Sequence, residues 1–321
     1  MTAVRGQTLD SVSNSPLRSD PPSTIARLKR GPTTSGAEGY LFISPFYLLF
    51  AVFALFPPVF GLYISFFNWN GLTHPTFVGL QNYDRILHST IFWDSLANTI
   101  EIALLASVPG LVLALLVAFV LDRYVDRLRN AYLTILFTPV VASTPAIALL
   151  FQLMFDPSHG VVDAGLHAVG LPAVNWLGGT IALKFTVAIL LIWRWLGYNA
   201  VIYLAGLQAV PEELYEAAAI DGASGRHVFR YVTLPQLRPV VLFTTVLSTI
   251  GILQLFTEPY LLAGANGGTN QTLLTMMMNM YNNAFSYFRF GYASALGIVL
   301  FIVALLGTLV NVVIGRRREA I

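Results

Sequence analysis

Long apolar stretches recur along the chain, and short polar segments separate them. A helix that crosses a bilayer needs about 20 mostly apolar residues, and six stretches reach that length. They are residues 41–66, 97–121, 131–155, 182–206, 240–263 and 292–314. This pattern predicts an all-α, polytopic membrane protein with six transmembrane helices.

Basic residues flank these stretches very unevenly. With six spans, fourteen Lys and Arg residues fall on one side of the membrane: five precede the first span, three follow the second, three lie between the fourth and fifth, and three follow the sixth. Only Arg85 and Arg289 fall on the opposite side. Because Lys and Arg concentrate in cytoplasmic loops, both termini are expected in the cytoplasm.

The composition agrees with a membrane protein. Hydrophobic residues make up 56% of the 321 residues and charged residues only 11%, whereas soluble domains are about 25% charged. The chain has no cysteine, which excludes disulfides and thiolate catalysis. Residues 1–39 are rich in Ser, Thr and Pro and are predicted to form a disordered cytoplasmic tail, followed by a membrane domain over 40–315 and a basic cytoplasmic tail over 316–321.

Prolines interrupt two of the predicted spans. Pro109 and Gly110 lie midway along the second, and Pro139 and Pro145 lie in the third. Proline leaves backbone carbonyls without a partner, which a helix facing lipid cannot tolerate unless its neighbours satisfy them. These residues indicate either ordinary kinks or a bundle that lines a cavity and bends during a cycle.

A charged segment, residues 207–239, lies between the fourth and fifth spans. Pro211 and the two Glu residues after it are typical of a helix start, and Gly222 is typical of a helix end. Ser224 can cap a second short helix, which Leu234-Pro235 is expected to end. The segment therefore predicts a cytoplasmic helix–turn–helix, and connections of this length are usually functional rather than simple joints.

The residues of this segment resemble the EAA motif of ABC importer permeases. The matching positions are Glu216, Ala217, Ala218, Gly222, Val232, Leu234 and Pro235. Further stretches, among them "FVGLQNYDRIL" and "NMYNNAF", resemble sugar-type permeases in the same order, and together they cover residues 40 to about 315. The turn "LLAGANGGTNQT" departs from the pattern of many relatives, because Thr269 stands where Pro is expected.

This resemblance implies a type I ABC importer permease fold of the carbohydrate-uptake type, similar to the first subunit of maltose and glycerol-3-phosphate permease pairs. It implies a coupling helix that docks into a cleft of a cytoplasmic ATPase. The residues expected to serve coupling are Glu216, Ala217, Ala218, Asp221, Gly222, Leu234 and Pro235.

The same resemblance implies the partners and the location. They are a second homologous permease, two cytoplasmic ABC ATPase subunits, an extracytoplasmic solute-binding protein and a sugar-type substrate, either an oligosaccharide or a glycerophospho-compound. The expected location is the bacterial cytoplasmic (inner) membrane, within the lipid bilayer, and no nucleic acid is expected to bind.

The energy source must lie outside this chain. ATP hydrolysis needs a Gly-rich loop that ends in Gly-Lys-Ser/Thr, and the two lysines, Lys29 and Lys184, have no such context. We therefore expect no cofactor here, with ATP and Mg²⁺ in the partner ATPase. The chain is expected to be a transporter subunit rather than an enzyme.

Polar and aromatic residues within the fourth and fifth spans are candidates for the substrate path, since polar groups are costly in a membrane and default to functional hypotheses. They are Trp193, Arg194, Trp195, Tyr198, Ser248, Gln254 and Glu258. Arg194 could bind a polar or acidic sugar, or it could form a structural ion pair with Glu101 or Glu258. The five histidines are scattered along the chain, so no metal site is expected.

Two other classes of protein fit the sequence less well. A stand-alone secondary transporter of a small polar solute would need ionisable pairs for coupling ions and an internal inverted repeat, and neither is evident. A membrane-embedded enzyme would need a cluster of catalytic groups at one depth, and the sequence offers none.

Overall fold

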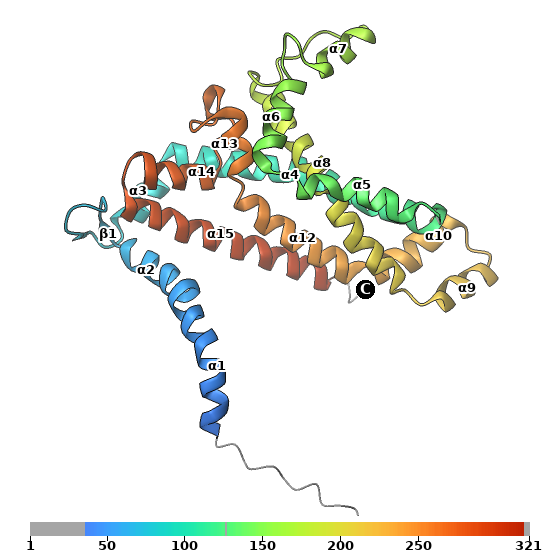
Figure 1. Ribbon diagram of the computed structural model, residues 1–321, viewed down its shortest axis with the longest axis horizontal. Helices are drawn as coiled ribbons and strands as arrows, with labels where there is room; N and C mark the ends of the chain where they lie inside the picture. The colour runs from blue at the N-terminus through green and yellow to red at the C-terminus, as the bar shows by residue number, and fades with distance from the viewer. Residues whose placement is uncertain (1–35, 126, 318–321) are drawn as a thin grey trace, which may run out of the picture. The chain divides into compact units, whose positions relative to one another are not determined.

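The computed structural model describes residues 36–125 and 127–317, and most of this part of the chain is helical (Figure 1). The chain divides after Leu55 into two compact units. The first unit contains helix α1 (Gly36–Phe50) and the π-helical turn η1 (Ala51–Leu55). Helix α1 thus begins inside the range 1–39 that the sequence assigned to a tail. The rest of that tail and residues 318–321 lie outside the described residues.

The second unit contains the other elements. Its longer helices are α4 (Thr90–Tyr124), α5 (Arg129–Val141), α6 (Thr144–Met154), α8 (Thr180–Gln208), α12 (Arg238–Leu253) and α15 (Phe290–Arg317). Its shorter helices are α2 (Phe56–Ile64), α3 (Gln81–Leu87), α7 (Val161–Ala168), α9 (Glu212–Ile220), α10 (Gly225–Val228), α11 (Leu234–Gln236), α13 (Thr257–Ala263) and α14 (Met276–Tyr281). The remaining elements are the helical turns η2 (Phe229–Thr233), η3 (Thr269–Gln271) and η4 (Asn282–Ser286), and strands β1 (Phe67–Asn68) and β2 (Thr76–Phe77), which pair antiparallel.

Candidate membrane spans among the described residues agree with the prediction of six spans. Four helical segments are long and apolar enough to cross a membrane: Tyr40–Ile64, Thr90–Tyr124, Thr180–Gln208 and Phe290–Gly315. They correspond to the first, second, fourth and sixth predicted spans. The number of spans rises to six if each of two bent helix pairs is one span.

The third predicted span is one of these bent pairs, not a single helix. Helices α5 and α6 meet at an angle of 98°. Ala142 and Ser143 between them are extended, and Pro145 lies in the first turn of α6, where its missing N–H breaks no helical hydrogen bond. The break lies at Pro145, whereas Pro139 stays inside α5, and the 98° bend is larger than an ordinary kink.

The fifth predicted span, 240–263, was wrong as one continuous helix. Helix α12 ends at Leu253, and α13 starts separately at Thr257. Pro259 in the first turn of α13 cannot donate a backbone hydrogen bond, which favours a new helix start there. The second bent pair is instead formed by α12 and the helical stretch Gly225–Gln236, which meet at 65°.

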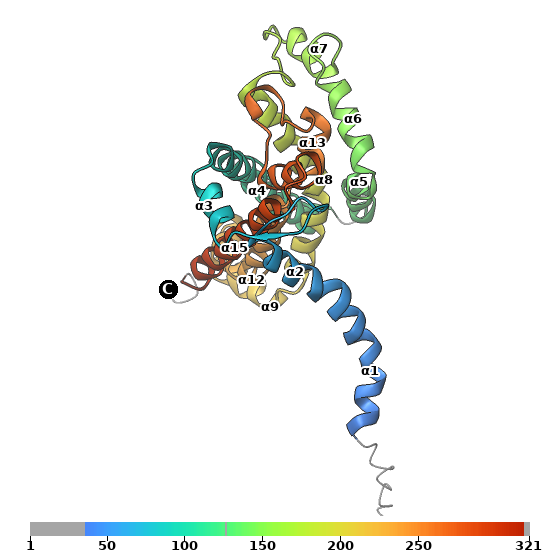
Figure 2. The same cartoon turned by 90° about the vertical axis from the view of Figure 1, so that its left-hand side faces the viewer.

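Small side chains allow the central helices to pack closely. Helix α4 packs along α8, and α8 also packs against α5, while α12 lies beside α15 in both views (Figures 1 and 2). Ala114, Ala118 and Ala200 are fully buried between α4 and α8. Helix association in membranes depends on such small residues, because lipid offers little hydrophobic driving force between helices.

Candidate functional site

The predicted coupling residues fall within residues 212–236, which we call the coupling segment. It consists of α9, a turn and the helical stretch Gly225–Gln236. Helix α9 ends at Ile220, and the predicted stop residue Gly222 follows two residues later with a φ of +69°, a left-handed conformation that suits glycine. The Gly222 amide donates to the Ala219 carbonyl (3.1 Å), and the Ala223 amide donates to the Ala218 carbonyl (2.9 Å). These two bonds form a Schellman motif, which satisfies carbonyls at the helix end.

The coupling segment presents most of the predicted residues to the surface. Glu216, Ala217, Asp221 and Gly222 are exposed, and Ala218 is half-buried. Beside them, the side chain of Ile220 is 87% exposed, which is unusual for an isoleucine and marks an apolar point on this surface.

Two details of the predicted helix–turn–helix were wrong. Leu234 and Pro235 do not end the second helix, because the helical stretch continues through them to Gln236, and both are only half-buried. Proline is tolerated here because π-helical turn η2 precedes it and relaxes the hydrogen-bond pattern. Ser224 occupies the expected capping position, but its hydroxyl contacts the ring nitrogen Nδ1 of His227 (2.7 Å) instead of a backbone amide.

Aromatic contacts anchor the coupling segment to the end of α4. The guanidinium of Arg123 lies 4.0 Å from the centre of the Tyr215 ring, a cation–π contact, and the Phe119 and Phe229 rings are 5.0 Å apart. Figure 1 shows α9 and α10 at the end of the bundle where α4 ends and α5 begins. This anchor was not predictable from the sequence, because no sequence pattern pairs Arg123 with Tyr215.

A cavity of about 370 Å³ lies between α4, α8, α12 and the stretch that leads into α13. Five predicted substrate-path residues line it: Trp195, Tyr198, Ser248, Gln254 and Glu258. Trp193 does not line it, because its ring packs 5.8 Å from the ring of Phe151 on α6. Residues two positions apart in a helix point to nearly opposite sides, so Trp193 and Trp195 do not face the same cavity.

Arg194 does not line the cavity either, because it forms an ion pair. Its Nη1 atom donates to Oε1 of Glu258 at 2.9 Å, and both side chains are nearly buried. Of the two partners that the sequence left open, Glu258 is the one the structure selects. Glu101 pairs with Lys184 instead.

Other polar residues of the cavity were missed. Ser107 on α4 shares a hydrogen bond of 2.8 Å with Ser248 on α12, and Asn199 and Thr257 also line the cavity. Asn199 follows Trp195 by four residues, a spacing that places both on one face of a helix. That spacing could have revealed Asn199, whereas Ser107 needed the packing of α4 against α12.

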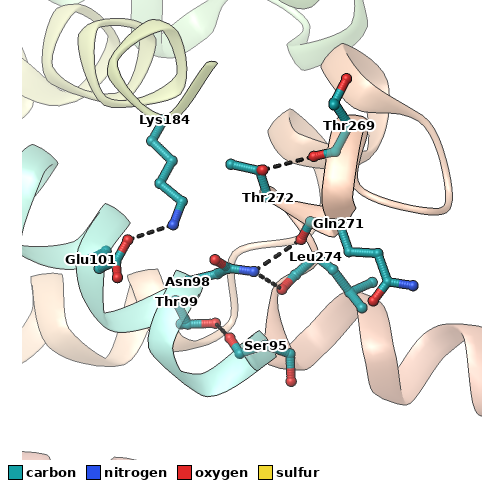
Figure 3. Close-up of polar contacts among 9 residues, drawn as sticks. All are labelled: Ser95, Asn98, Thr99, Glu101, Lys184, Thr269, Gln271, Thr272 and Leu274. Atoms are coloured by element: carbon teal, nitrogen blue, oxygen red, sulfur yellow. Dashed lines mark hydrogen bonds and ion pairs between the residues drawn. The ribbon is translucent and has the colours of Figure 1, made fainter. Parts of the chain in front are cut away.

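A loop, residues 264–275, lies against the N-terminal half of α4 (Figure 3). Arg123 is at the other end of this helix. The amide nitrogen of the buried Asn98 side chain donates to the carbonyls of Gln271 (2.9 Å) and Leu274 (3.3 Å). The Met276 amide donates to the hydroxyl of Thr99 (3.0 Å). Two side chains of α4 thus form hydrogen bonds with backbone groups of the loop and of Met276, which follows it.

Replacing Asn98 with Ala is expected to loosen this loop and lower the free energy of unfolding by about 1–3 kcal/mol, because the carbonyls of Gln271 and Leu274 both lose the Asn98 amide as a donor. The Gln271 carbonyl still accepts a hydrogen bond from the Leu274 amide (2.9 Å). Hydrogen exchange of the amides in residues 264–276 should rise, together with a lower thermal midpoint. Asn266→Ala is the matched control, since Asn266 is exposed in the same loop. Equal exchange in the two variants would contradict the role of Asn98.

A metal centre finds no support in this part of the chain. Among residues 36–125 and 127–317, no three His, Asp or Glu side chains gather closely enough to hold a metal ion.

Together, the fold and these features define a polytopic helical membrane protein in which an exposed helical segment is joined to helices that line a cavity. The family described as binding-protein-dependent transport system inner membrane component matches residues 110–320. The chain belongs to this family. It is therefore a transporter subunit, a permease, rather than an enzyme or a stand-alone transporter.

Relatives and a solved structure agree with this assignment. The lactose transport system permease protein of Rhizobium radiobacter is 37% identical over 267 residues, which cover 82% of this chain and 89% of the relative. The arabinooligosaccharides transport system permease protein of Bacillus subtilis (strain 168) is 36% identical over 276 residues, covering 86% and 87% of the two chains.

The solved structure is that of a bacterial ABC transporter involved in the import of the acidic polysaccharide alginate. One of its chains is similar to this one with a TM-score of 0.76 and 25% sequence identity, over 88% of this chain and 96% of that chain. The fold is thus the type I ABC importer permease fold that the sequence resemblance implied.

Proposed function

We propose that this chain forms half of the translocation pathway for a sugar and couples its passage to ATP hydrolysis by separate subunits. A second homologous permease supplies the other half, two cytoplasmic ABC ATPases bind ATP and Mg²⁺, and an extracytoplasmic solute-binding protein delivers the sugar. Both termini and the coupling segment face the cytoplasm of a bacterial cell, in line with the basic residues on that side.

The observation that carries the coupling role is the physical connection between the coupling segment and the cavity. The helical stretch Gly225–Gln236 runs through a 65° bend into α12, and α12 contributes Ser248 to the cavity wall. The Arg123–Tyr215 contact ties the same segment to α4, a second wall of the cavity. Movement of a docked ATPase would therefore shift both α4 and α12, two walls of the cavity.

The chemistry of the cavity supports a sugar as the transported substrate. Sugars have an apolar face and a rim of hydroxyl groups, and the cavity offers the aromatic rings of Trp195 and Tyr198 beside the polar groups of Ser248 and Gln254. Ligand sites commonly combine such apolar walls with a few polar groups. The relatives named above for lactose and arabinooligosaccharides favour the same class.

Purification of the assembled complex through this chain tests the proposal. We expect mass spectrometry to identify a second permease and an ABC ATPase in the complex. Proteoliposomes that contain the complex, with the binding protein outside, should accumulate labelled lactose, trehalose or arabinotriose only when ATP and Mg²⁺ are present inside the vesicles. A complex without an ATPase, or uptake independent of ATP, would contradict the proposed function.

A further inference from the structure

We propose that the cavity admits uncharged saccharides and discriminates against anionic ones, and that Glu258 is the residue that sets this preference. The inference rests on the proposed function, because it names the class of sugar that the same cavity takes. It also assigns a specificity role to a carboxylate that the sequence placed in the substrate path without one.

The arrangement of charge around the cavity carries the inference. Glu258 is the one charged residue among those that line the cavity in the described part of the chain. The nearest cation, Arg194, lies outside the lining and donates through Nη1 to Oε1 of Glu258. Of this ion pair, therefore, Glu258 borders the cavity and Arg194 does not.

Burial holds this pair in place. The side chains of Arg194 and Glu258 are 12% and 11% exposed, so little water screens either charge. Among the described residues, the buried Nε atom of Arg194 has no hydrogen-bond partner, so the guanidinium depends on the carboxylate for its pairing. Breaking a buried pair leaves an uncompensated charge and is strongly destabilising, so Arg194 cannot easily be released to bind an acidic ligand.

The other polar groups of the cavity suit hydroxyl groups. They are hydroxyls and side-chain amides of Ser107, Tyr198, Asn199, Ser248, Gln254 and Thr257. Such groups can both donate and accept hydrogen bonds, which matches the dual character of a sugar hydroxyl. An anionic sugar would instead meet the carboxylate of Glu258 in a poorly screened site, where like charges repel one another.

The test uses ligands that differ only in charge. Neutral lactose, trehalose and maltotriose are titrated first into the assembled complex in lipid nanodiscs without binding protein, and binding is followed by isothermal titration calorimetry. For each sugar that binds, one primary alcohol is converted to the uronic acid and, as the matched control, to the uncharged uronamide. We expect the acid to bind at least about tenfold more weakly than the uronamide.

Two variants assign this discrimination to the pair. Glu258→Gln removes the carboxylate and leaves Arg194 cationic, so the preference for the uronamide over the acid should disappear or reverse. The double variant Arg194→Gln/Glu258→Gln carries neither charge. Its dissociation constants for the acid and the uronamide should therefore agree to within about twofold. The double variant decides the role of the pair even if the single variant fails to assemble.

Each outcome bears on one of the two proposals. If no neutral sugar binds, the proposed function fails. If neutral sugars bind and the acid binds as tightly as its uronamide, the charge discrimination fails while the proposed function stands. If the wild-type discrimination persists unchanged in the double variant, it does not come from Glu258, and its assignment to that residue is overturned.

Discussion

A chain that carries Ala in place of Glu216 and Val in place of Gly222 is expected to insert and assemble normally but to lose ATP-driven transport altogether. Gly222 has a φ of +69°, and a β-branched residue in that region is strained by about 1–3 kcal/mol. The Schellman hydrogen bonds at the end of α9 would be lost, and the surface next to Ala217 would change shape. Removal of Glu216 also takes an exposed carboxylate from the surface proposed to dock the ATPase.

Uptake and substrate-stimulated ATP hydrolysis in proteoliposomes measure the effect, and membrane fractionation measures insertion. The matched control is Glu213→Ala/Gly225→Ala, which changes an exposed Glu and a Gly of the same segment. A Cβ at Gly225 meets no atom within 4 Å, and its backbone is not left-handed. Transport at wild-type rates in the Glu216/Gly222 variant would show that the coupling assignment is mistaken.

The length of an apolar stretch predicts a span reliably when the stretch has no internal break. Helices α4, α8 and α15 match three predicted spans because nearly every residue in them favours a helix in an apolar environment. The second span nevertheless begins at Thr90, seven residues before the predicted start at residue 97. Ser89 caps the helix by accepting a hydrogen bond from the Phe92 amide, a local signal that hydropathy does not register.

Breaks in the helices were harder to predict, because tertiary contacts decide where a proline ends a helix. Pro109 stays inside α4, whereas Pro145 and Pro259 start new helices. The break after α12 is also held by a distant residue, since the hydroxyl of Thr275 donates to the Leu255 carbonyl at 2.7 Å. A sequence pattern cannot reveal a partner twenty positions away.

The coupling segment and the cavity also differ in how far local sequence predicts them. The end of α9 was predictable, because the left-handed turn at Gly222 depends on local backbone geometry alone. The cavity was predictable only in part, because its wall includes Ser107 from a helix about 140 residues away from Ser248. Arg194 illustrates the limit: the sequence offered two carboxylates as partners, and only packing of α8 against α13 selects Glu258.

Replacing Gly197 with Ala is expected to lower the free energy of unfolding by about 3 kcal/mol or more. Gly197 lies where α8 crosses α5, and a Cβ there would overlap the backbone carbonyl of Leu136 and approach the Phe137 nitrogen to 2.8 Å. Backbone atoms inside a helix cannot rotate away as a side chain can, so the two helices would have to separate. Yield of folded protein and the thermal midpoint in detergent measure the effect.

Gly165→Ala provides the control, because Gly165 is also in a helix and a Cβ there meets nothing within 4 Å. Alanine favours a helix over glycine by about 1 kcal/mol, so the control should be neutral or slightly stabilising. Separation of α5 from α8 should also disturb the cavity, because Tyr198 lies next to Gly197, and its ring faces that of Phe137 on α5 as well as lining the cavity. We therefore expect Gly197→Ala to weaken sugar binding in the fraction that folds, whereas equal thermal midpoints for the two variants would contradict the close crossing of α5 and α8.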